Sequence, residues 1–588
     1  MAERWFIKNK KMDYKRMAQK YGITELMSRL IVNRDITKDE VIKSYINPEL
    51  NMLHDPREMK DMNKASDILI DKIKGKKKIR IIGDYDVDGV ISVYILYSAL
   101  KRCNADVDYE IPDRIKDGYG VNVNIINKAK EDGVDTILTC DNGISAIEPI
   151  KAAKELGMTV IVTDHHDIPF IEDEEENRTF IRSEADAILN PKQEDCRYKF
   201  KYLCGAGVAF KLVQVLYEEL GIDKEEAFRF IEFLAIATVC DVVDLIDENR
   251  VFVKKGLEKI NKTTNIGLQE LLTECEIQDK KIGVYHLGFI IGPCINASGR
   301  LDNAKKGVRL LLSEDEREAV LLAKELVKLN EERKEMTQNG VEDAIEIVEN
   351  SEIKNDKVFV IYLPHIHESL AGIIAGRIRE KYNVPTLVLT KSEDGAKGSG
   401  RSIEEYNMFE ELVKCKDLLE RFGGHPMAAG FSLKEENIDE FRKRLNSVTT
   451  LTQEDLLRKV TIDTVLPLDS ITFELIRDLE RLEPFGKANS KPLFGEKDVN
   501  VIKASVLGKN RNVLKLRLKT KNGKIIDSVY FGDIEEFENT IIDKYGKEEL
   551  LKLYDGIYND VKVDLVFYPD INEYNGNVSI QIVIQNYR

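Results

Sequence analysis

Short apolar runs alternate with longer amphipathic stretches from residue 78 onward. The runs "IRIIGD" (79–84), "VDTILTCDNG" (134–143) and "MTVIVTDHH" (158–166) are rich in β-branched residues, as buried strands are. The stretches between them, such as "GVISVYILYSALKR" (89–102), have the pattern of helices. This alternation is typical of βαβ units, so we predict an α/β domain built on a parallel sheet.

The same patterning divides the remainder of the chain. The stretch "AVLLAKELVKLNEERKEM" (319–336) carries an apolar stripe on a charged background and predicts one long helix. A second α/β unit follows it, and from about residue 459 strands alternate with turn signals such as "KNGK" (521–524). We therefore expect a helical N-terminal segment over 1–60, an α/β domain over 61–313, a connecting helix over 314–350, a second α/β domain over 351–450 and a β-rich domain over 455–588.

Length and composition indicate a multidomain protein outside the membrane. At 588 residues the chain is too long for one hydrophobic core, and no apolar run is long enough to span a bilayer. The N-terminus lacks the apolar segment of a secretory signal and the eight cysteines form no C-x-x-C pair, so we expect a cytoplasmic protein with free thiols. The net charge of -16 argues against binding nucleic acid over the whole surface but leaves room for a local basic strip.

Acidic and histidine residues collect at the ends of the three strands. Open α/β sheets bind ligands at the carboxyl ends of their strands, so we expect these side chains to converge. Carboxylates mixed with imidazole suit Mn²⁺ or Mg²⁺, and carboxylates crowded together repel one another unless cations neutralise them. Two such ions can activate a water and stabilise the leaving oxygen of a displacement at phosphorus. The candidates are Asp84, Asp86, Asp88, Asp141, His165, His166 and Asp241.

An ordinary structural role is the alternative for each of these residues taken alone. A single aspartate after a strand is usually a turn or helix cap, and "DNG" (141–143) is a common turn sequence. Three such endings in successive βαβ units favour a metal site. For Asp241, in "ATVCDVVDL" (237–245), helix capping is a stronger alternative than it is for the others.

The motifs in this order resemble a known family. "DYDVDG" (84–89), "DNG", "DHH" (164–166) and "CDVVDL" (240–245) are similar to the four motifs of the DHH phosphoesterases, and "GSGRS" (398–402) with "FGGHPMAAGF" (422–431) to their second, DHHA1-like domain. "LMSRLIVNRDIT" (26–37), "GPCINASGRLDNA" (292–304) and "LEPFGKANSKPLF" (482–494) resemble the RecJ single-stranded DNA exonucleases within that group. The resemblance covers nearly the whole chain.

The resemblance implies a role for each motif residue. Asp86, Asp88, Asp141, His165 and Asp241 would hold two Mn²⁺ or Mg²⁺ ions, with Asp141 as the bridge, and His166 would orient or contact a phosphate. Many members of the family have histidine where this chain has Ile82. Either one metal is therefore held less tightly, or Asp84 helps to bind it.

The resemblance also implies contacts with DNA phosphates. Arginine presents a planar fork to phosphate and glycine permits close backbone approach, although a surface ion pair is the alternative for any single arginine. The matching positions are Arg114, Asn296, Arg300, Ser399, Arg401, Gly423, Gly424 and His425.

One basic segment stands out in this acidic chain. "GKNRNVLKLRLKTKNGK" (508–524) contains seven Lys or Arg residues and no acid, and three leucines alternate with Lys515, Arg517 and Lys519. A strand would bury the leucines and present the cations on its other face. In the family this region resembles an OB-fold, which binds single strands, whereas the alternative is an edge strand protected by lysines.

The implied activity is stepwise 5′ to 3′ hydrolysis of single-stranded DNA to 5′-mononucleotides by a two-metal mechanism, in DNA repair and recombination. The family suggests a single-strand binding protein and a RecQ-type helicase as partners. Two other functions stay open: a DHH phosphodiesterase of short oligonucleotides or cyclic dinucleotides, and a scaffold that binds single strands without cleaving them.

Overall fold

The computed structural model describes residues 3–113, 120–172, 178–392, 395–508, 511–574 and 576–588. They form two compact units, which are described separately. The first unit comprises His54–Val243 and Lys255–Arg458, and the second comprises Glu3–Leu53, Asp244–Lys254 and Lys459–Arg588.

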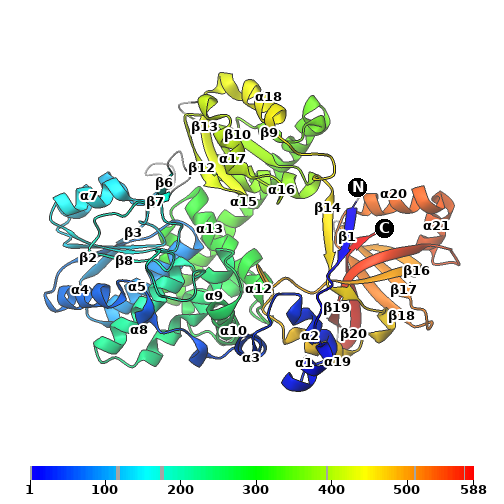
Figure 1. Cartoon of the computed structure of the whole chain (residues 1–588), viewed down its shortest axis with the longest axis horizontal. Coiled ribbons are helices and arrows are strands. Elements are labelled where there is room, and N and C mark those ends of the chain that lie inside the picture. Colours follow the sequence, from blue (N-terminus) through cyan, green and yellow to red (C-terminus); the bar gives the residue numbers. More distant parts are fainter. Residues whose placement is uncertain (1–2, 114–119, 173–177, 393–394, 509–510, 575) are drawn as a thin grey trace. The chain divides into compact units, whose positions relative to one another are not determined.

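A five-stranded parallel sheet forms the centre of the first half of the first unit. Its strand order is β3-β2-β4-β5-β8, and every neighbouring pair is parallel. Helices α6 and α7 cover one face of the sheet, and α5 and α8 cover the other (Figure 1). The elements are β2 (Ile79–Ile82), β3 (Val107–Glu110), β4 (Thr136–Cys140), β5 (Thr159–Thr163), β8 (Ala187–Leu189), α4 (Met62–Lys74), α5 (Val87–Arg102), α6 (Val123–Glu131), α7 (Ile147–Glu155) and α8 (Gly205–Glu219).

A layer of helices follows and leads into a second sheet. The longest, α15 (Glu316–Glu349), is the expected connecting helix, and it packs against α13 and α16. The second sheet has the order β12-β13-β11-β10-β9, in which only β9 and β10 are parallel. The elements are α9 (Ile231–Cys240), α11 (Ile266–Glu274), α13 (Gly292–Leu301), α14 (Lys305–Leu312), β9 (Phe359–Tyr362), α16 (Ala371–Tyr382), β10 (Thr386–Ser392), β11 (Gly395–Arg401), α17 (Met408–Val413), β12 (Arg421–His425), β13 (Ala428–Leu433) and α18 (Ile438–Val448).

The second unit contains a closed β-barrel. Strand β16 pairs with β17 on one side and with β19 on the other, so that β16, β17, β18, β20 and β19 form a ring. Closure leaves none of these strands as a free edge, which is the principle of an OB-type barrel. The elements are β15 (Thr464–Val465), α19 (Phe473–Glu480), β16 (Phe494–Leu507), β17 (Val513–Lys519), β18 (Ile525–Tyr530), α20 (Ile534–Tyr545), α21 (Lys547–Asp555), β19 (Lys562–Tyr574) and β20 (Asn577–Tyr587).

This architecture confirms the predicted fold class: a parallel-sheet α/β domain, a long helix, a second α/β domain and a β-rich region. It also places the N-terminal residues differently from the expected segment of their own over 1–60. Strand β1 (Glu3–Ile7) pairs with β14 (Arg458–Ile462), and α2 (Glu25–Val32) buries Met27, Leu30 and Ile31 in the core of the second unit. The reason is that α2 has a broad apolar face, which must be covered by another element. Helices α1 (Tyr14–Tyr21) and α3 (Asp39–Ile46) complete this region.

A membrane-spanning helix is not found in the part of the chain that the structure describes, since none of its helices combines the necessary length and hydrophobicity.

We predict that Leu30→Ala destabilises the second unit by about 2–5 kcal/mol, because Leu30 is fully buried in its core and the substitution leaves a cavity. Trp5, the only tryptophan, packs against Val460 and Val566 of the same unit, so its fluorescence during urea unfolding reports on this unit. The exposed Val41→Ala is the matched control. An unchanged midpoint of the Trp5 transition in Leu30→Ala would contradict the shared core.

Candidate metal centre and phosphate pocket

The turn after β2 presents the first carboxylates. Asp86 is the N-cap of α5, and its side chain accepts a hydrogen bond from the backbone N–H of Gly89 at 3.0 Å. Asp88 lies in the first turn of α5, where its buried carboxylate accepts hydrogen bonds from the backbone N–H groups of Gly205 and Ala206 at 2.5 and 2.8 Å. These two groups begin α8, so the partial positive charge of a helix N-terminus faces Asp88.

The side chains at the ends of the other strands lie close to these carboxylates. His165 Nε2 lies 3.1 Å from Asp141 Oδ1, 3.8 Å from Asp88 Oδ2 and 3.7 Å from Asp241 Oδ2. The potential ligand atoms fall into three groups, each with all atoms within 4.8 Å of one another: Asp88, His165 and Asp241; Asp84, Asp86 and Asp141; and Asp141, His165 and His166. All seven residues singled out in the sequence are therefore brought together.

The donor set fits divalent metal ions. Asp141 Oδ1, His165 Nε2 and Asp241 Oδ2 are buried and form no hydrogen bond with any residue that the structure describes. Burial and the neighbouring carboxylates raise the pKa of Asp88 to about 6, and raise the pKa values of Asp141 and Asp241 well above the ordinary range. A divalent cation between these atoms would supply the missing partners and offset the repulsion, and oxygen donors with one imidazole suit Mn²⁺ or Mg²⁺.

His166 differs from His165 in its charge. Burial lowers the pKa of His165 to about 3, so its ring is neutral and can act as a ligand. Burial would lower the pKa of His166 too, but the hydrogen bond between its Nδ1 and Asp164 Oδ1, at 2.7 Å, raises it to about 9. His166 is therefore an imidazolium at neutral pH, a suitable contact for a phosphate oxygen.

Two supporting residues were not found by sequence reasoning. Asp164 accepts hydrogen bonds from the backbone N–H groups of Ile144, His165 and His166, and this holds the two histidines in place. Gly205 lies so close to the centre that a Cβ there would be 2.6 Å from Asp141 Cβ. The signal for Asp164 was its place in "DHH" at the end of β5, whereas nothing local marks Gly205.

The position that departs from the family pattern lies in the hydrophobic core. Ile82 is fully buried and packs in the apolar cluster that includes Ile126 and Val160. Its side chain therefore contributes no ligand. Asp84 brings a carboxylate oxygen to within 4.8 Å of ligand atoms of Asp86 and Asp141, which favours its participation as a ligand.

Three of the predicted phosphate contacts line one cavity of the first unit. Arg300, Ser399 and Arg401 surround a space of about 340 Å³ beside Gly372, near the start of α16. A Cβ at Gly372 would lie 2.7 Å from the Arg401 guanidinium, so the glycine permits this approach. Two arginines and a helix N-terminus suit a phosphate group.

The other predicted contacts are placed elsewhere. Asn296 Oδ1 accepts a hydrogen bond from the backbone N–H of Val87 at 3.1 Å, so it braces the carboxylate turn, and a contact with DNA stays a prediction. Gly423, Gly424 and His425 are exposed on β12, and His425 also lines a cavity of about 350 Å³ that includes His166. Arg114 lies outside the described residues.

The basic strand of the second unit is β17. Leu514, Leu516 and Leu518 are buried inside the barrel, as predicted, and the cations between them face outward. Lys515 Nζ lies 2.7 Å from Asp527, and Arg517 Nε lies 3.6 Å from the same carboxylate. Asp527 therefore offsets part of the positive charge, and the exposed Lys519 extends the strip.

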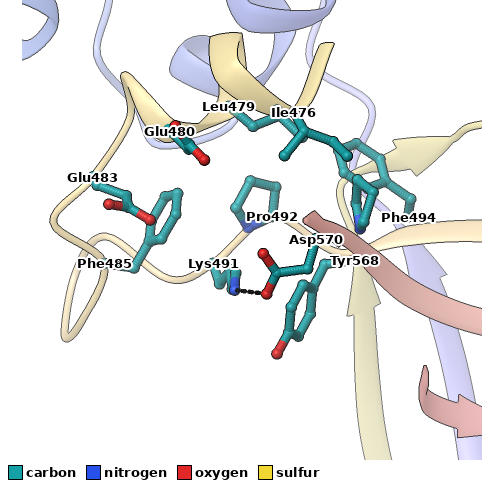
Figure 2. Close-up of a pocket in the computed structure, with 11 residues that line it drawn as sticks. Ile476, Leu479, Glu480, Glu483, Phe485, Lys491, Pro492, Phe494, Tyr568 and Asp570 are labelled. Atoms are coloured by element: carbon teal, nitrogen blue, oxygen red, sulfur yellow. Dashed lines mark ion pairs between the residues drawn. The ribbon is translucent and has the colours of Figure 1, made fainter. Parts of the chain in front are cut away.

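The segment "LEPFGKANSKPLF" forms a different kind of pocket, shown in Figure 2. Lys491 lies beside Asp570 and Tyr568, with its Nζ 3.7 Å from the carboxylate and 3.6 Å from the ring centre. The pocket is small, about 50 Å³, and is also lined by Glu480 and Glu483. With three carboxylates and one lysine it does not suit a phosphate.

We predict that Gly205→Ala weakens Mn²⁺ binding at least ~10-fold, because the added Cβ displaces Asp141 and supporting groups of this kind are worth that much. Isothermal titration with Mn²⁺ measures the effect. Gly376→Ala, in α16, is the control, because no atom outside the neighbouring backbone of its own helix is closer than 4.0 Å to the new Cβ. Equal affinities in the two variants would show that Gly205 does not shape the centre.

Three family descriptions match successive parts of the chain. The DHH family N-terminal domain matches residues 78–238, the DHHA1 domain matches residues 355–450, and the RecJ OB domain matches residues 462–586. They correspond to the parallel-sheet domain, the second α/β domain and the barrel.

Curated relatives and solved structures extend the match to the whole chain. The single-stranded-DNA-specific exonuclease RecJ of Bacillus subtilis is 36% identical over 592 residues, covering 99% of this chain and 70% of the relative. RecJ of Escherichia coli is 31% identical, covering 95% of each protein. RecJ of Thermus thermophilus in complex with Mn²⁺ has a TM-score of 0.81 and 26% identity, covering 100% of this chain and 79% of that one, and a structure with Mg²⁺ gives a TM-score of 0.76. The chain belongs to the RecJ family of single-stranded-DNA-specific exonucleases.

Proposed function

We propose that this chain is a metal-dependent exonuclease that hydrolyses single-stranded DNA from its 5′ end and releases 5′-mononucleotides. The observation that carries the proposal is the buried cluster in which ligand atoms of Asp141, His165 and Asp241 lack partners among the described residues. Membership of the RecJ family and the match to structures in complex with Mn²⁺ and Mg²⁺ support the same activity.

The metal ligands proposed here are Asp84, Asp86, Asp88, Asp141, His165 and Asp241. When bound, two Mn²⁺ or Mg²⁺ ions activate water and neutralise charge that develops on the phosphoryl oxygens. Asp88 is held by the start of α8 through two backbone hydrogen bonds, so this carboxylate is positioned before metal or DNA binds, and Gly205 leaves room for Asp141 beside it. Such preorganisation lowers the cost of forming the reactive arrangement.

The protein's own cations act on the phosphates. The His166 imidazolium donates to a non-bridging oxygen of the scissile phosphate, and Asp164 keeps the ring charged and oriented. Arg300, Ser399 and Arg401 bind the phosphate at the 5′ end. A pocket that accepts a terminal phosphate selects a strand end over an internal position, which is the requirement for an exonuclease.

The barrel favours a long single strand over the alternative substrates. A phosphodiesterase of dinucleotides does not need a second unit that presents Lys515, Arg517 and Lys519 on one strand. Cations along a barrel surface suit the backbone of an extended strand. The same unit is available to a non-cleaving scaffold, which the complete ligand set disfavours.

The cellular setting belongs to the same proposal. All eight cysteines are free, as expected in the reducing cytoplasm. There the chain would act in DNA repair and recombination, with a single-strand binding protein and a RecQ-type helicase supplying the single strands. The resemblance to the family is the support for these partners.

Asp141→Ala is expected to reduce metal-dependent release of nucleotides from single-stranded DNA at least ~100-fold while DNA binding is retained, because the bridging ligand is lost and the phosphate pocket is not. The assay compares 5′-labelled and 3′-labelled strands with Mn²⁺, Mg²⁺ or chelator. Glu148→Ala, an exposed carboxylate on α7, is the control. Cleavage confined to dinucleotides would favour the phosphodiesterase, and binding without cleavage under every condition would favour the scaffold.

Arg401→Ala is expected to lower kcat/KM roughly 10- to 100-fold on strands with a 5′-phosphate, because a hydrogen bond to a charged group is worth about 1.5–3 kcal/mol. The loss on strands with a 5′-hydroxyl should be much smaller. Arg377→Ala, an exposed arginine of α16, controls for net charge. If both substrates lose activity equally, the pocket does not hold the terminal phosphate.

A further inference from the structure

Two cysteine thiols of the first unit lie in contact with each other. The sulfur atoms of Cys275 and Cys294 are 3.8 Å apart, within hydrogen-bonding distance for two thiols. Cys275 follows the last residue of α11, and Cys294 lies in the first turn of α13. Both thiols are free. The fold therefore brings together two reduced sulfurs that belong to different helices.

The two thiols differ in their access to solvent. Cys294 is only 1% exposed, whereas Cys275 is partly exposed at the end of its helix. The contact with Cys275 and burial raise the pKa of the Cys294 thiol, so Cys294 keeps its proton and donates the hydrogen bond. Of the two sulfurs, that of Cys275 is the one that a small oxidant in solution reaches first.

Polar and cationic groups of α15 surround the pair. Asn330 Nδ2 donates a hydrogen bond to Cys294 Sγ at 3.3 Å, and Arg333 Nη2 donates to Asn330 Oδ1 at 2.9 Å. The hydrogen bond from Cys294 and the positive charge of Lys334 hold the pKa of the Cys275 thiol below its usual range. A partly exposed cysteine in a cationic setting is typical of reactive thiols, because the thiolate is the form that reacts.

Cys294 lies on the helix that carries two residues of the candidate site. Asn296, two residues further along α13, accepts the hydrogen bond from the backbone N–H of Val87 in the carboxylate turn. Arg300, six residues further along, lines the phosphate pocket. A displacement at the start of α13 therefore reaches both the carboxylate turn and the phosphate pocket.

We propose that Cys275 and Cys294 form an oxidation site, at which hydrogen peroxide converts the two thiols into a disulfide and thereby lowers the nuclease activity. The effect on activity rests on the proposed function, whereas formation of the disulfide does not. Disulfides in a reducing cytoplasm are usually transient and serve catalysis or redox sensing, which suits a reversible site of this kind.

The oxidation proceeds in two steps. The Cys275 thiolate attacks one oxygen of hydrogen peroxide, the O–O bond breaks, and the departing hydroxide takes up a proton to leave as water, which gives a sulfenic acid. The Cys294 sulfur then attacks the Cys275 sulfur, and its proton leaves with the sulfenic hydroxide as a second water. Two thiols thus lose two electrons, and one peroxide is reduced to two waters. A dithiol reductant restores both thiols.

The disulfide requires movement of the protein. A disulfide has an S–S distance of about 2.05 Å, so the two sulfurs must approach by about 1.7 Å. Since Cys294 is closely packed, part of this approach falls on the start of α13. The 3.1 Å hydrogen bond between Asn296 and the Val87 N–H is lost once it stretches to about 3.6 Å, so a shift of about 0.5 Å is sufficient.

The test treats the full chain with hydrogen peroxide in chelator, so that no metal ion takes part in the oxidation. Catalase then removes the peroxide, Mn²⁺ is added, and release of nucleotides from single-stranded DNA is measured. We expect the oxidised wild type to lose activity at least ~10-fold, because misplacing a group of the site by about 1 Å can cost ~100-fold, and to regain it with dithiothreitol. Mass spectrometry after alkylation should show a cross-linked peptide that contains Cys275 and Cys294.

Three variants assign the effect to this pair. Cys275→Ser should have wild-type activity before peroxide and keep it afterwards. Cys294→Ala should also keep its activity, and its Cys275 should stop at the sulfenic acid, which dimedone labels. Cys103→Ser is the matched control, because Cys103 likewise follows the last residue of a helix, α5, and it should respond as the wild type does.

The outcomes separate this proposal from the proposed function. Peroxide treatment that yields no Cys275–Cys294 cross-link would overturn the oxidation site. A cross-link with unchanged activity, or an equal loss of activity in Cys275→Ser and the wild type, would overturn its effect on the nuclease. A reduced wild type that releases no nucleotide would instead overturn the proposed function, and the cross-linked peptide would still test the oxidation site.

Discussion

The repulsion among buried carboxylates is the constraint on which this structure depends. Asp88, Asp141 and Asp241 all lie within 4 Å of His165 Nε2, in a place where burial makes each negative charge costly. The protein offsets one of these charges itself, because the first two N–H groups of α8 bind Asp88. The charges of Asp141 and Asp241 are not offset in this way. Burial and the neighbouring carboxylates raise the pKa values of both groups, and a bound cation would relieve this repulsion.

Helix α13 connects the carboxylate cluster with the phosphate pocket. On α13, Gly299 permits such close approach that a Cβ there would lie 2.1 Å from the Tyr85 carbonyl oxygen, and Asn296 binds the N–H of Val87. One residue after Gly299, the Arg300 guanidinium donates to the Ser369 carbonyl at 2.8 Å. The distance between the metal centre and the pocket is therefore set by a rigid element, which suits an enzyme that must remove one nucleotide at a time.

The sequence predicted those features that residues close together in the chain determine by themselves. The strand endings predicted which carboxylate and histidine side chains converge, because parallel strands bring their carboxyl ends to one edge. The alternation in β17 predicted which side chains face the barrel core. The roles of Gly205 and Asn296 were not predicted, because each residue acts on residues more than 60 positions away in the sequence. The packing of α2 in the core of the second unit escaped for the same reason: an apolar helix face shows that a partner exists, not which one.

The net charge of the chain limits where DNA can bind. With a net charge of -16, the protein as a whole repels a polyanion, so the proposed attraction to DNA would have to come from local groups such as Arg300, Arg401 and the cations of β17. Attraction of this kind weakens as salt rises, because it releases counterions. An acidic nuclease of this kind would therefore hold single-stranded DNA through a few local cations, without the broad basic surface that would also bind duplex DNA.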